Sequence, residues 1–213
     1  MPQQSPIDID PTEVKELVMD DSTGKIELTI GRSDGFIEHG GSNFKVHWNG
    51  GNNSVLKLRD GREFHPIQFH FHTPSEHTVE GKAFPFCMHL VHQSKDGQLA
   101  VVGVFFEEGE ESEFLAQFWD LLAEAEPRGE KIAVKDIHFD SLKIDNESFY
   151  RYEGSLTTPP YTEGVEWVIV KDPRTVSAAQ IQQFIDVIPA DSNARDLQPL
   201  EGAAGRVLFC CEA

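Results

Sequence analysis

The alternation of side chains in FHPIQFHFH (64–72) constrains the fold of this chain more than any other feature. Successive side chains of a β-strand point to opposite faces of the sheet. Because the apolar face of such a strand can enter a core, its two imidazoles would lie side by side on the opposite surface. The pattern predicts a polar face with Gln68, His70 and His72 and an apolar face with Ile67, Phe69 and Phe71.

A second strand is predicted at CMHLVH (87–92), where Cys87, His89 and Val91 share one face. If it pairs antiparallel with the first strand, His89 meets His70 and His72, and the linking segment is long enough for this return. Three neutral imidazoles with one open position are typical of a catalytic zinc site. An isolated His-x-His pair is more often a surface pair or a hydrogen-bonded core pair, so the spacing alone leaves both interpretations open.

Most other segments are predicted to be strands, because they are short, rich in β-branched or aromatic residues, and bounded by turn sequences. Helical spacing of apolar residues predicts helices at 113–126 and 177–188, the second capped by Ser177. Strands and helices do not alternate, which argues against a doubly wound parallel sheet. We therefore predict a mainly β fold with a few short helices (α+β). The strands are IELTI (26–30), FKVHW (44–48), SVLKL (54–58), QLAVVGVFF (98–106) and VEWVIV (165–170), with a hairpin turn at KDG (95–97).

Length and charge narrow the range of functions. The 213 residues suffice for one domain with a sizeable core, and 36 acidic against 18 basic residues leave a formal net charge of −18. Such a surface repels nucleic acid and anionic membranes, so we expect neither as a partner. The acidic run EEGEESE (107–113) is predicted to be a solvated loop rather than a binding tail.

The sequence carries few signals of location. The first residues contain neither the basic region nor the apolar run of a signal peptide, and no stretch approaches the roughly 18 apolar residues of a membrane-spanning helix. Three cysteines are too few for a disulfide framework. These observations favour an intracellular protein, and a trimmed secreted or organellar form is the alternative.

Five motifs follow one another along the chain: QSPIDI (4–9), QFHFH (68–72), SEHTV (75–79), MHLVH (88–92) and GSLTTPP (154–160). Together with Asn193, Arg195 and QPL (198–200), they make the chain resemble the α-class carbonic anhydrases from about Gln4 to Val207. The resemblance implies a single domain over residues 1–213, built on one large, twisted, mostly antiparallel sheet, without the family's usual segment before the QSPI motif. It also implies a lyase that is sensitive to sulfonamides and hydrates carbon dioxide reversibly to bicarbonate and a proton, by attack of zinc-bound hydroxide.

The resemblance also implies roles for individual residues. His70, His72 and His89 would be the zinc ligands. The Thr157 hydroxyl would donate to the Glu76 carboxylate, which leaves only its lone pairs to face the reacting hydroxide. The implied substrate pocket consists of Val91, Val101, Leu156, Thr158 and Trp167, most of which are equally good core residues. Gln68, Cys87 and Asn193 are expected to lie behind the ligands, and His77 and His92 to be buried and structural.

The chain departs from the family's pattern beside the metal. A glutamate normally stands two residues before the third ligand and accepts its N–H; here the residue is Cys87. Loss of such an acceptor typically costs about ten- to a hundredfold in metal affinity or activity. Cys87 is expected to lie behind His89, the alternative being a stray metal ligand. The usual proton-carrying histidine corresponds to Ser42, and His39 is a candidate substitute, although an exposed loop histidine is the simpler interpretation.

Two other functions stay open. A carbonic-anhydrase-like protein could bind or store a ligand without catalysis, although such relatives usually lose a ligand histidine and all three are present here. The same site could also hydrolyse esters as a side activity. We expect a monomer that acts on a small molecule, carbon dioxide or bicarbonate, with Zn²⁺ as its cofactor.

Overall fold

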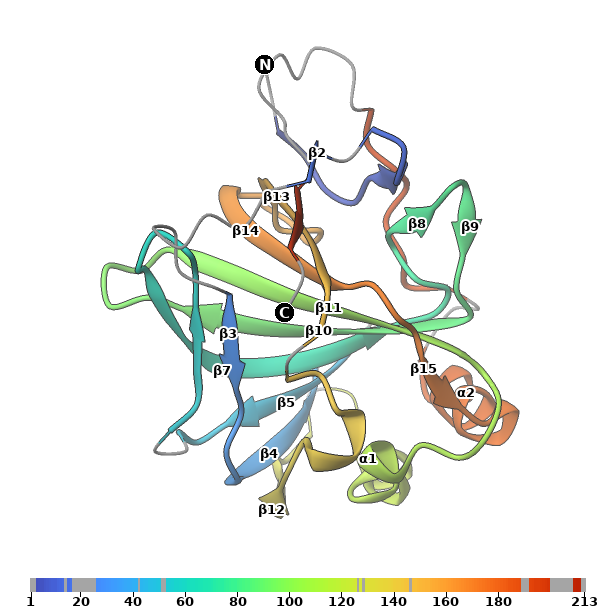
Figure 1. Cartoon of the computed structure of the whole chain (residues 1–213). Coiled ribbons are helices and arrows are strands. Elements are labelled where there is room, and N and C mark those ends of the chain that lie inside the picture. The colour runs from blue at the N-terminus through green and yellow to red at the C-terminus, as the bar shows by residue number, and fades with distance from the viewer. Residues whose placement is uncertain are drawn as a thin grey trace.

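The computed structural model describes residues 3–13, 15–16, 26–41, 43–50, 53–125, 127, 129–145, 147–188, 192–199 and 209–211. Strands dominate the described part of the chain, with a few short helices at one side (Figure 1). The strands are β1 (Asp8–Ile9), β2 (Lys15–Glu16), β3 (Glu27–Thr29), β4 (Ser33–His39), β5 (Phe44–Trp48), β6 (Val55–Lys57), β7 (Glu63–His72), β8 (Thr78–Val79), β9 (Lys82–Ala83), β10 (Phe86–Gln93), β11 (Leu99–Glu108), β12 (Ile132–Ile137), β13 (Phe149–Ser155), β14 (Glu163–Val170), β15 (Arg174–Val176) and β16 (Phe209–Cys211). The α-helices are α1 (Glu113–Ala116) and α2 (Ala178–Ile185), and the 3₁₀ helices are η1 (Trp119–Glu124) and η2 (Asp140–Leu142).

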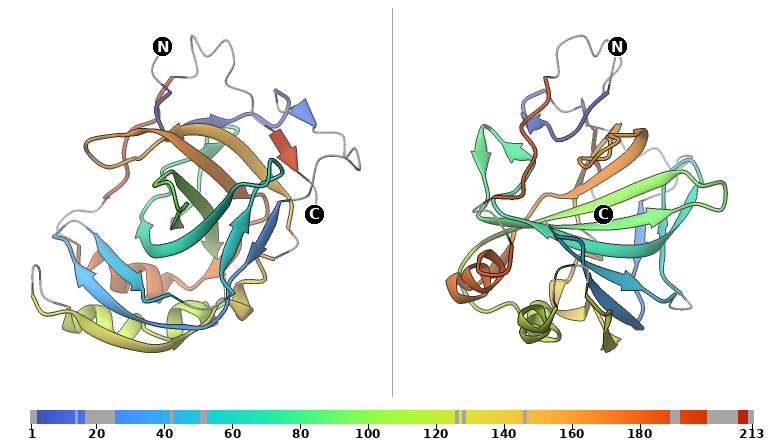
Figure 2. Two further views of the ribbon diagram at one scale, coloured as in Figure 1. Left: turned by 90° about the vertical axis from the view of Figure 1, so that its left-hand side faces the viewer. Right: turned by 180° about the vertical axis from the view of Figure 1, so that it is seen from behind.

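Thirteen strands form one large sheet, and its long path runs β12-β4-β5-β7-β10-β11-β14-β13-β16-β2. Most neighbours are antiparallel, with parallel pairs at β11–β14, β11–β15 and β16–β2. The sheet twists and curls strongly, which the two views of Figure 2 show. β1, β8 and β9 make a small separate sheet. The predicted fold class, mainly β with short helices and a large, mostly antiparallel sheet, is confirmed.

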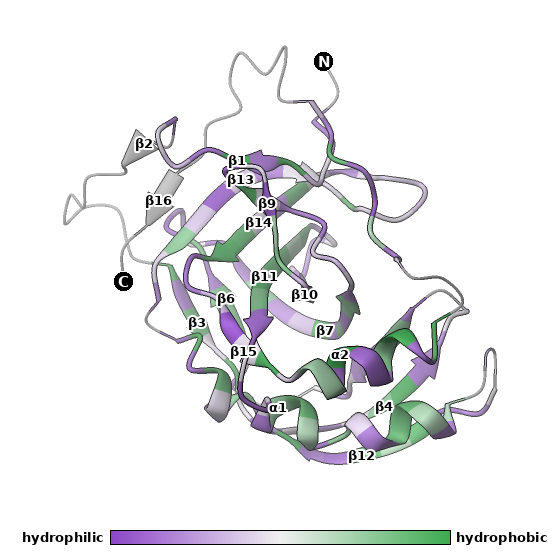
Figure 3. Cartoon of the chain, turned by 90° about the vertical axis from the view of Figure 1, so that its right-hand side faces the viewer, coloured by the Kyte–Doolittle hydropathy of each residue, from purple (hydrophilic) through white to green (hydrophobic). Residues whose placement is uncertain are grey.

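One face of the large sheet packs against the helices (Figure 3). The ring centroids of Phe69 of β7 and Phe114 of α1 lie 5.6 Å apart, and those of Phe86 of β10 and Phe184 of α2 lie 5.3 Å apart. These side chains are fully buried. Their packing anchors β7 and β10 from behind, so the opposite face of the two strands is held in place for the histidines.

Ile67 does not share the buried face of Phe69 and Phe71, and that part of the prediction is wrong. Its residue surface is 38% exposed, whereas both phenylalanines are fully buried. The cause is a register shift opposite β10: Val91 pairs with Gln68, but His92 pairs with Pro66. Ile67 is the extra residue of this β-bulge, and a bulge resets the alternation on its own strand.

The predicted helix at 113–126 is divided in two. α1 ends at Ala116 and η1 begins at Trp119, with Phe118 between them at φ −148° and ψ 1°, outside the helical region. By contrast, α2 begins where expected, with Ser177 and Gln180 forming a capping box. In the described part of the chain, no helix is both long and apolar enough to cross a membrane.

Candidate metal centre

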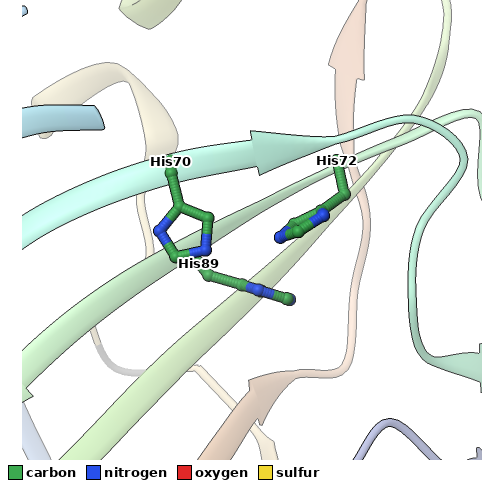
Figure 4. A group of neighbouring side chains, drawn as sticks. All are labelled: His70, His72 and His89. Carbon is green, nitrogen blue, oxygen red and sulfur yellow. The ribbon is translucent and has the colours of Figure 1, made fainter. Parts of the chain in front are cut away.

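His70, His72 and His89 converge on the sheet face opposite the helices (Figure 4). The predicted antiparallel pairing of β7 and β10 brings them together, because His89 lies directly opposite His70. One nitrogen from each ring lies within 4.8 Å of the other two, and all three residues are buried or at the edge of burial. Figure 4 shows the three rings turned toward a common point. Among the described residues, this is the group of side chains suited to hold a metal ion.

Hydrogen bonds fix which nitrogen faces the common point. Nδ1 of His70 donates to Oε1 of Gln68 at 3.0 Å, and Nδ1 of His72 donates to the backbone carbonyl of Asn193 at 3.0 Å. With these protons on Nδ1, the Nε2 lone pairs are left for a metal. Nε2 of His72 is buried and has no hydrogen-bond partner in the described part of the chain. An orphaned buried nitrogen of this kind fits a metal ligand.

His89 has a weaker partner than the other two histidines. Its Nε2 lies 3.8 Å from Sγ of Cys87, so its Nδ1 is the nitrogen that faces the other rings. Burial raises the pKa of the Cys87 thiol, and the nearby charge of Glu76 raises it further, against smaller opposing hydrogen bonds from the backbone. Cys87 is therefore a neutral thiol behind His89, and a thiol sulfur is a weak acceptor.

The electrostatics of the site favour the neutral form of His70 and His89, the form that metal ligation requires. Burial lowers the pKa of His70 well below its ordinary value, and the neighbouring His72 and Lys45 lower it further. Burial likewise lowers the pKa of His89, with smaller effects from His72, His70 and His77. Both rings therefore keep a lone pair for a cation across the neutral pH range.

Glu76 lies beside the histidines but is not bonded as expected. It is 3% exposed, and its Oε1 accepts the backbone N–H of Arg195 at 2.9 Å. Its Oε2 lies 3.6 Å from Nδ1 of His89 and has no hydrogen-bond partner among the described residues. Thr157 is also buried, at 8% exposure, yet the hydrogen bond expected from its hydroxyl to Glu76 is not formed.

The apolar residues expected in the pocket lie next to the triad. Val91, Val101 and Trp167 occupy one row across β10, β11 and β14, and each is at most 5% exposed. The Trp167 ring centroid lies 4.9 Å from that of His89. Leu156 packs against this cluster, whereas Thr158 is exposed. The row forms an apolar wall at one side of the triad.

Neither residue considered for proton transfer is supported. Ser42 lies outside the described residues. His39 is buried rather than exposed in a loop, at 5% exposure. Its Nδ1 accepts the N–H of Gly41 at 3.0 Å, and its Nε2 donates to the carbonyl of Val187 at 3.2 Å. Both nitrogens are thus engaged by the backbone, which leaves no lone pair to take up a proton.

Residues far along the chain hold the site together, and local sequence patterns did not reveal how. The Asn193 side chain bonds the backbone of Phe71 and Thr73 at 3.0 Å each, which clamps the end of β7. The Arg195 guanidinium donates to the carbonyl of Ser5 at 2.6 Å and stacks over the ring of Tyr161. The family resemblance, which includes Asn193 and Arg195, was the available signal, but it does not show which atoms meet.

His77 and His92 are buried, as expected for structural histidines. Nε2 of His77 lies 2.5 Å from the Tyr152 hydroxyl, which in turn lies 2.8 Å from Oγ of Ser5. Gly154 is required beside this network, because an added Cβ would lie 2.2 Å from Oγ of Ser5. The end of β13 at Gly154 and Ser155 thus packs against the N-terminal segment around Ser5.

Comparison with known proteins agrees with this geometry. The sequence profile of the family described as "Eukaryotic-type carbonic anhydrase" matches residues 1–204. A carbonic anhydrase of Klebsiella pneumoniae is 43% identical over 143 residues, which are 67% of this chain and 57% of that protein. One from Pectobacterium atrosepticum is 37% identical over 166 residues, 78% of this chain and 66% of that protein. The chain thus spans less than two thirds of the length of these two curated relatives.

Solved structures give the same result. The α-carbonic anhydrase of Thermovibrio ammonificans, in complex with the inhibitor sulfanilamide, aligns with a TM-score of 0.85 and 36% identity, covering 97% of this chain and 86% of that one. Dioscorin complexed with ascorbate aligns with a TM-score of 0.86 and 31% identity, covering 99% of this chain and 86% of that one. From the profile match over nearly the whole chain, together with the buried histidine triad on the expected strands, we conclude that this protein belongs to the carbonic anhydrase family of the eukaryotic type.

Proposed function

We propose that this protein catalyses the zinc-dependent, reversible hydration of carbon dioxide to bicarbonate and a proton. The observation that carries the proposal is the convergence of three buried imidazoles. In each ring, the nitrogen that points away from the other two rings already contacts a protein side chain or carbonyl. Neutral nitrogen ligands leave the charge of a divalent cation uncompensated. When bound, Zn²⁺ supplies Lewis-acid chemistry, which in carbonic anhydrases lowers the pKa of water to about 7 and provides a nucleophile near neutral pH.

Glu76 and Thr157 are proposed to orient that nucleophile. Arg195 holds Oε1 of Glu76, which leaves Oε2 as an acceptor for the Thr157 hydroxyl. A hydroxyl that donates its single hydrogen bond to a carboxylate has only lone pairs left for the nucleophile, so it can accept a hydrogen bond from the nucleophile but not donate one to it.

The apolar wall is proposed to hold carbon dioxide. Val91, Val101 and Trp167 offer the uncharged, linear substrate an apolar surface beside the triad and exclude water from it. Leu156 and Thr158 are proposed to border the same pocket on the side of the 154–160 turn. Bicarbonate, which is charged, is poorly held by such a surface and leaves toward solvent.

A non-catalytic binding or storage protein is the alternative function. One observation favours it: the neutral thiol of Cys87 gives His89 a poor acceptor, which weakens the hold on a metal. The likeness to dioscorin, solved with ascorbate, shows that this fold also occurs with an organic ligand. The two functions differ in whether the purified protein retains zinc and uses it.

The deciding experiment joins a metal assay to stopped-flow measurement of carbon dioxide hydration. We expect close to one zinc per chain and hydration that a sulfonamide abolishes. His72→Ala should lose both the zinc and the hydration, whereas His65→Ala, an exposed histidine earlier on β7, should keep both. A folded parent protein that binds no zinc, or binds zinc without hydrating carbon dioxide, would contradict the proposal.

A further inference from the structure

The structure assigns to His47 the task of carrying the product proton to solvent, an inference that rests on the proposed function. Each carbon dioxide that becomes bicarbonate releases one proton, which must leave before the next turnover. Imidazole is the side chain whose ordinary pKa suits this transfer near neutral pH. The nine histidines of the chain all lie in its described part, so each can be considered.

Six of the nine histidines are unsuited to this task. Three form the triad, and three others are buried: His39, His77 and His92 are at most 5% exposed. Of the remaining three, His138 follows the edge strand β12, three strands away from β7. His65 lies five residues before His70, beyond the bulge, with Nδ1 bonded to the carbonyl of Ser54 at 3.0 Å. His47 is left.

His47 lies on the triad's face of the sheet, beside the strand that carries two of its members. Its neighbours on β5, Val46 and Trp48, point into the helix-covered core, so His47 points to the other face. It pairs directly with Gln68, whose Oε1 accepts from His70. From strand spacing, the Cα atoms of His47 and His70 lie about 8 Å apart, a gap that bridging water can span.

The surroundings of His47 suit a proton carrier. Its Nε2 lies 2.7 Å from Oε2 of Glu38, and its ring stacks on Phe36 with centroids 4.5 Å apart. These contacts fix the ring, while Nδ1 has no hydrogen-bond partner among the described residues. The side chain is 29% exposed, so solvent bases reach it. Charged groups near His47 on this face include Lys45, two residues along β5 and opposite His70, and Lys131, whose Nζ lies over the Phe36 ring. Asp34, two residues before Phe36 on β4, forms an ion pair with Lys135.

The transfer balances in protons and charge. The proton released with bicarbonate travels through bridging water and forms an N–H bond at Nδ1 of His47. The ring then carries one positive charge, which the Glu38 carboxylate on Nε2 offsets. A buffer base breaks the new N–H bond and takes the proton, which restores the neutral ring.

The test compares zinc-loaded parent, His47→Ala and His65→Ala in weak and in strong buffer. A proton carrier acts after bicarbonate has formed, so its loss lowers kcat and spares kcat/KM for carbon dioxide. We expect His47→Ala to lose about tenfold or more in kcat in weak buffer, and to recover it in strong buffer or with added imidazole. Glu38→Gln should lower the weak-buffer kcat in the same direction. The matched control His65→Ala should behave as the parent.

Zinc content and melting temperature provide a readout apart from turnover, and both should equal those of the parent in His47→Ala. A parent that hydrates carbon dioxide while His47→Ala keeps its weak-buffer kcat overturns the inference and leaves the proposed function standing. An equal loss in His65→Ala, or a loss that imidazole does not restore, also overturns it. A zinc-loaded parent without any hydration would overturn both.

Discussion

Sγ of Cys87 lies 3.8 Å from Nε2 of His89, on the side of the ring away from His70 and His72. His70 and His72 each donate to an oxygen at 3.0 Å, so His89 alone among the three depends on a sulfur. The hydrogen bond made by the ring nitrogen that does not bind the metal sets the tautomer and basicity of a histidine ligand. A stronger acceptor in place of Cys87 should therefore strengthen metal binding by His89.

Cys87→Glu should tighten zinc binding by about ten- to a hundredfold and raise turnover, because a carboxylate would hold the proton on Nε2 of His89. Competition with a chromophoric chelator measures the affinity, and stopped-flow hydration measures the turnover. Cys87→Gln, which supplies a neutral oxygen as Gln68 does, should give a smaller gain. Cys87→Ala should bind zinc about as the parent does, because little is lost with the sulfur. Unchanged affinity in Cys87→Glu would argue against this role.

Thr157→Val should lower turnover about a hundredfold or more, because valine keeps the shape of threonine without the hydroxyl that orients the nucleophile. Zinc affinity should be unchanged, since Thr157 is not among the residues that contact the ligand nitrogens. Thr162→Val changes an exposed threonine a few residues later in the same way and should have little effect. Equal losses in the two variants would show that Thr157 has no special part in the reaction.

The stability of the zinc-free protein should fall between pH 6.5 and 4, in part because of His92. Full burial lowers the pKa of His92 from 6.5 to about 4, against the hydrogen bond from its Nδ1 to the carbonyl of Leu90. Over this range the unfolded chain binds a proton that the folded protein does not. No stability is lost above about pH 6.5, and the loss grows as the pH falls, reaching about 3 kcal/mol near pH 4.

His92→Gln keeps a donor for Leu90 and removes this titration. Its free energy of unfolding, measured with urea at several pH values, should depend less steeply on pH than that of the parent. His70 and His89 contribute in the same direction in both proteins, because burial also lowers the pKa of each. Identical pH slopes in parent and variant would show that His92 is not buried in its neutral form.

Phe69→Ala should cost about 3–5 kcal/mol in the free energy of unfolding, because Phe69 is fully buried against Phe71, Phe114, Phe118 and Phe139. Ile67→Ala, two residues away, should cost no more than about 0.5 kcal/mol because its side chain lies in solvent at the bulge. Urea unfolding of both variants compares the two positions. A similar cost at both would mean that the strand keeps a simple alternation.

Local pattern was sufficient for the strands that carry the triad, whereas the resemblance to the family's motifs was needed to identify the three histidines as metal ligands. Strict alternation after the bulge places His70, His72 and Gln68 on one face, and a short hairpin after His92 leads β11 back beside β10. Alternation could not reveal the bulge at Ile67, because it arises from pairing with β10 rather than from β7 itself. The break at Phe118 has the same origin: apolar spacing is helical throughout, but packing against the sheet decides where the helix ends.

Tertiary contacts decide the remaining details of the site. His39 looks like a loop histidine in the sequence, yet the carbonyl of Val187, 148 residues later, binds it in a buried position. The orientation of Glu76 depends on Arg195, 119 residues away. The extent of the domain over residues 1–213 and the monomeric state stay predictions.

The contacts of Asn193 with β7 and of Arg195 with Glu76 determine when the site can reach its final arrangement during synthesis. A ribosome releases β7 and β10, with all three histidines, roughly a hundred residues before the segment that fixes His72 and Glu76; the separations are 121 and 119 residues. Until that segment emerges, Nδ1 of His72 lacks the carbonyl of Asn193 that fixes its tautomer. Metal captured before then would be held by incompletely oriented ligands, and the segment with Asn193 and Arg195 completes their orientation.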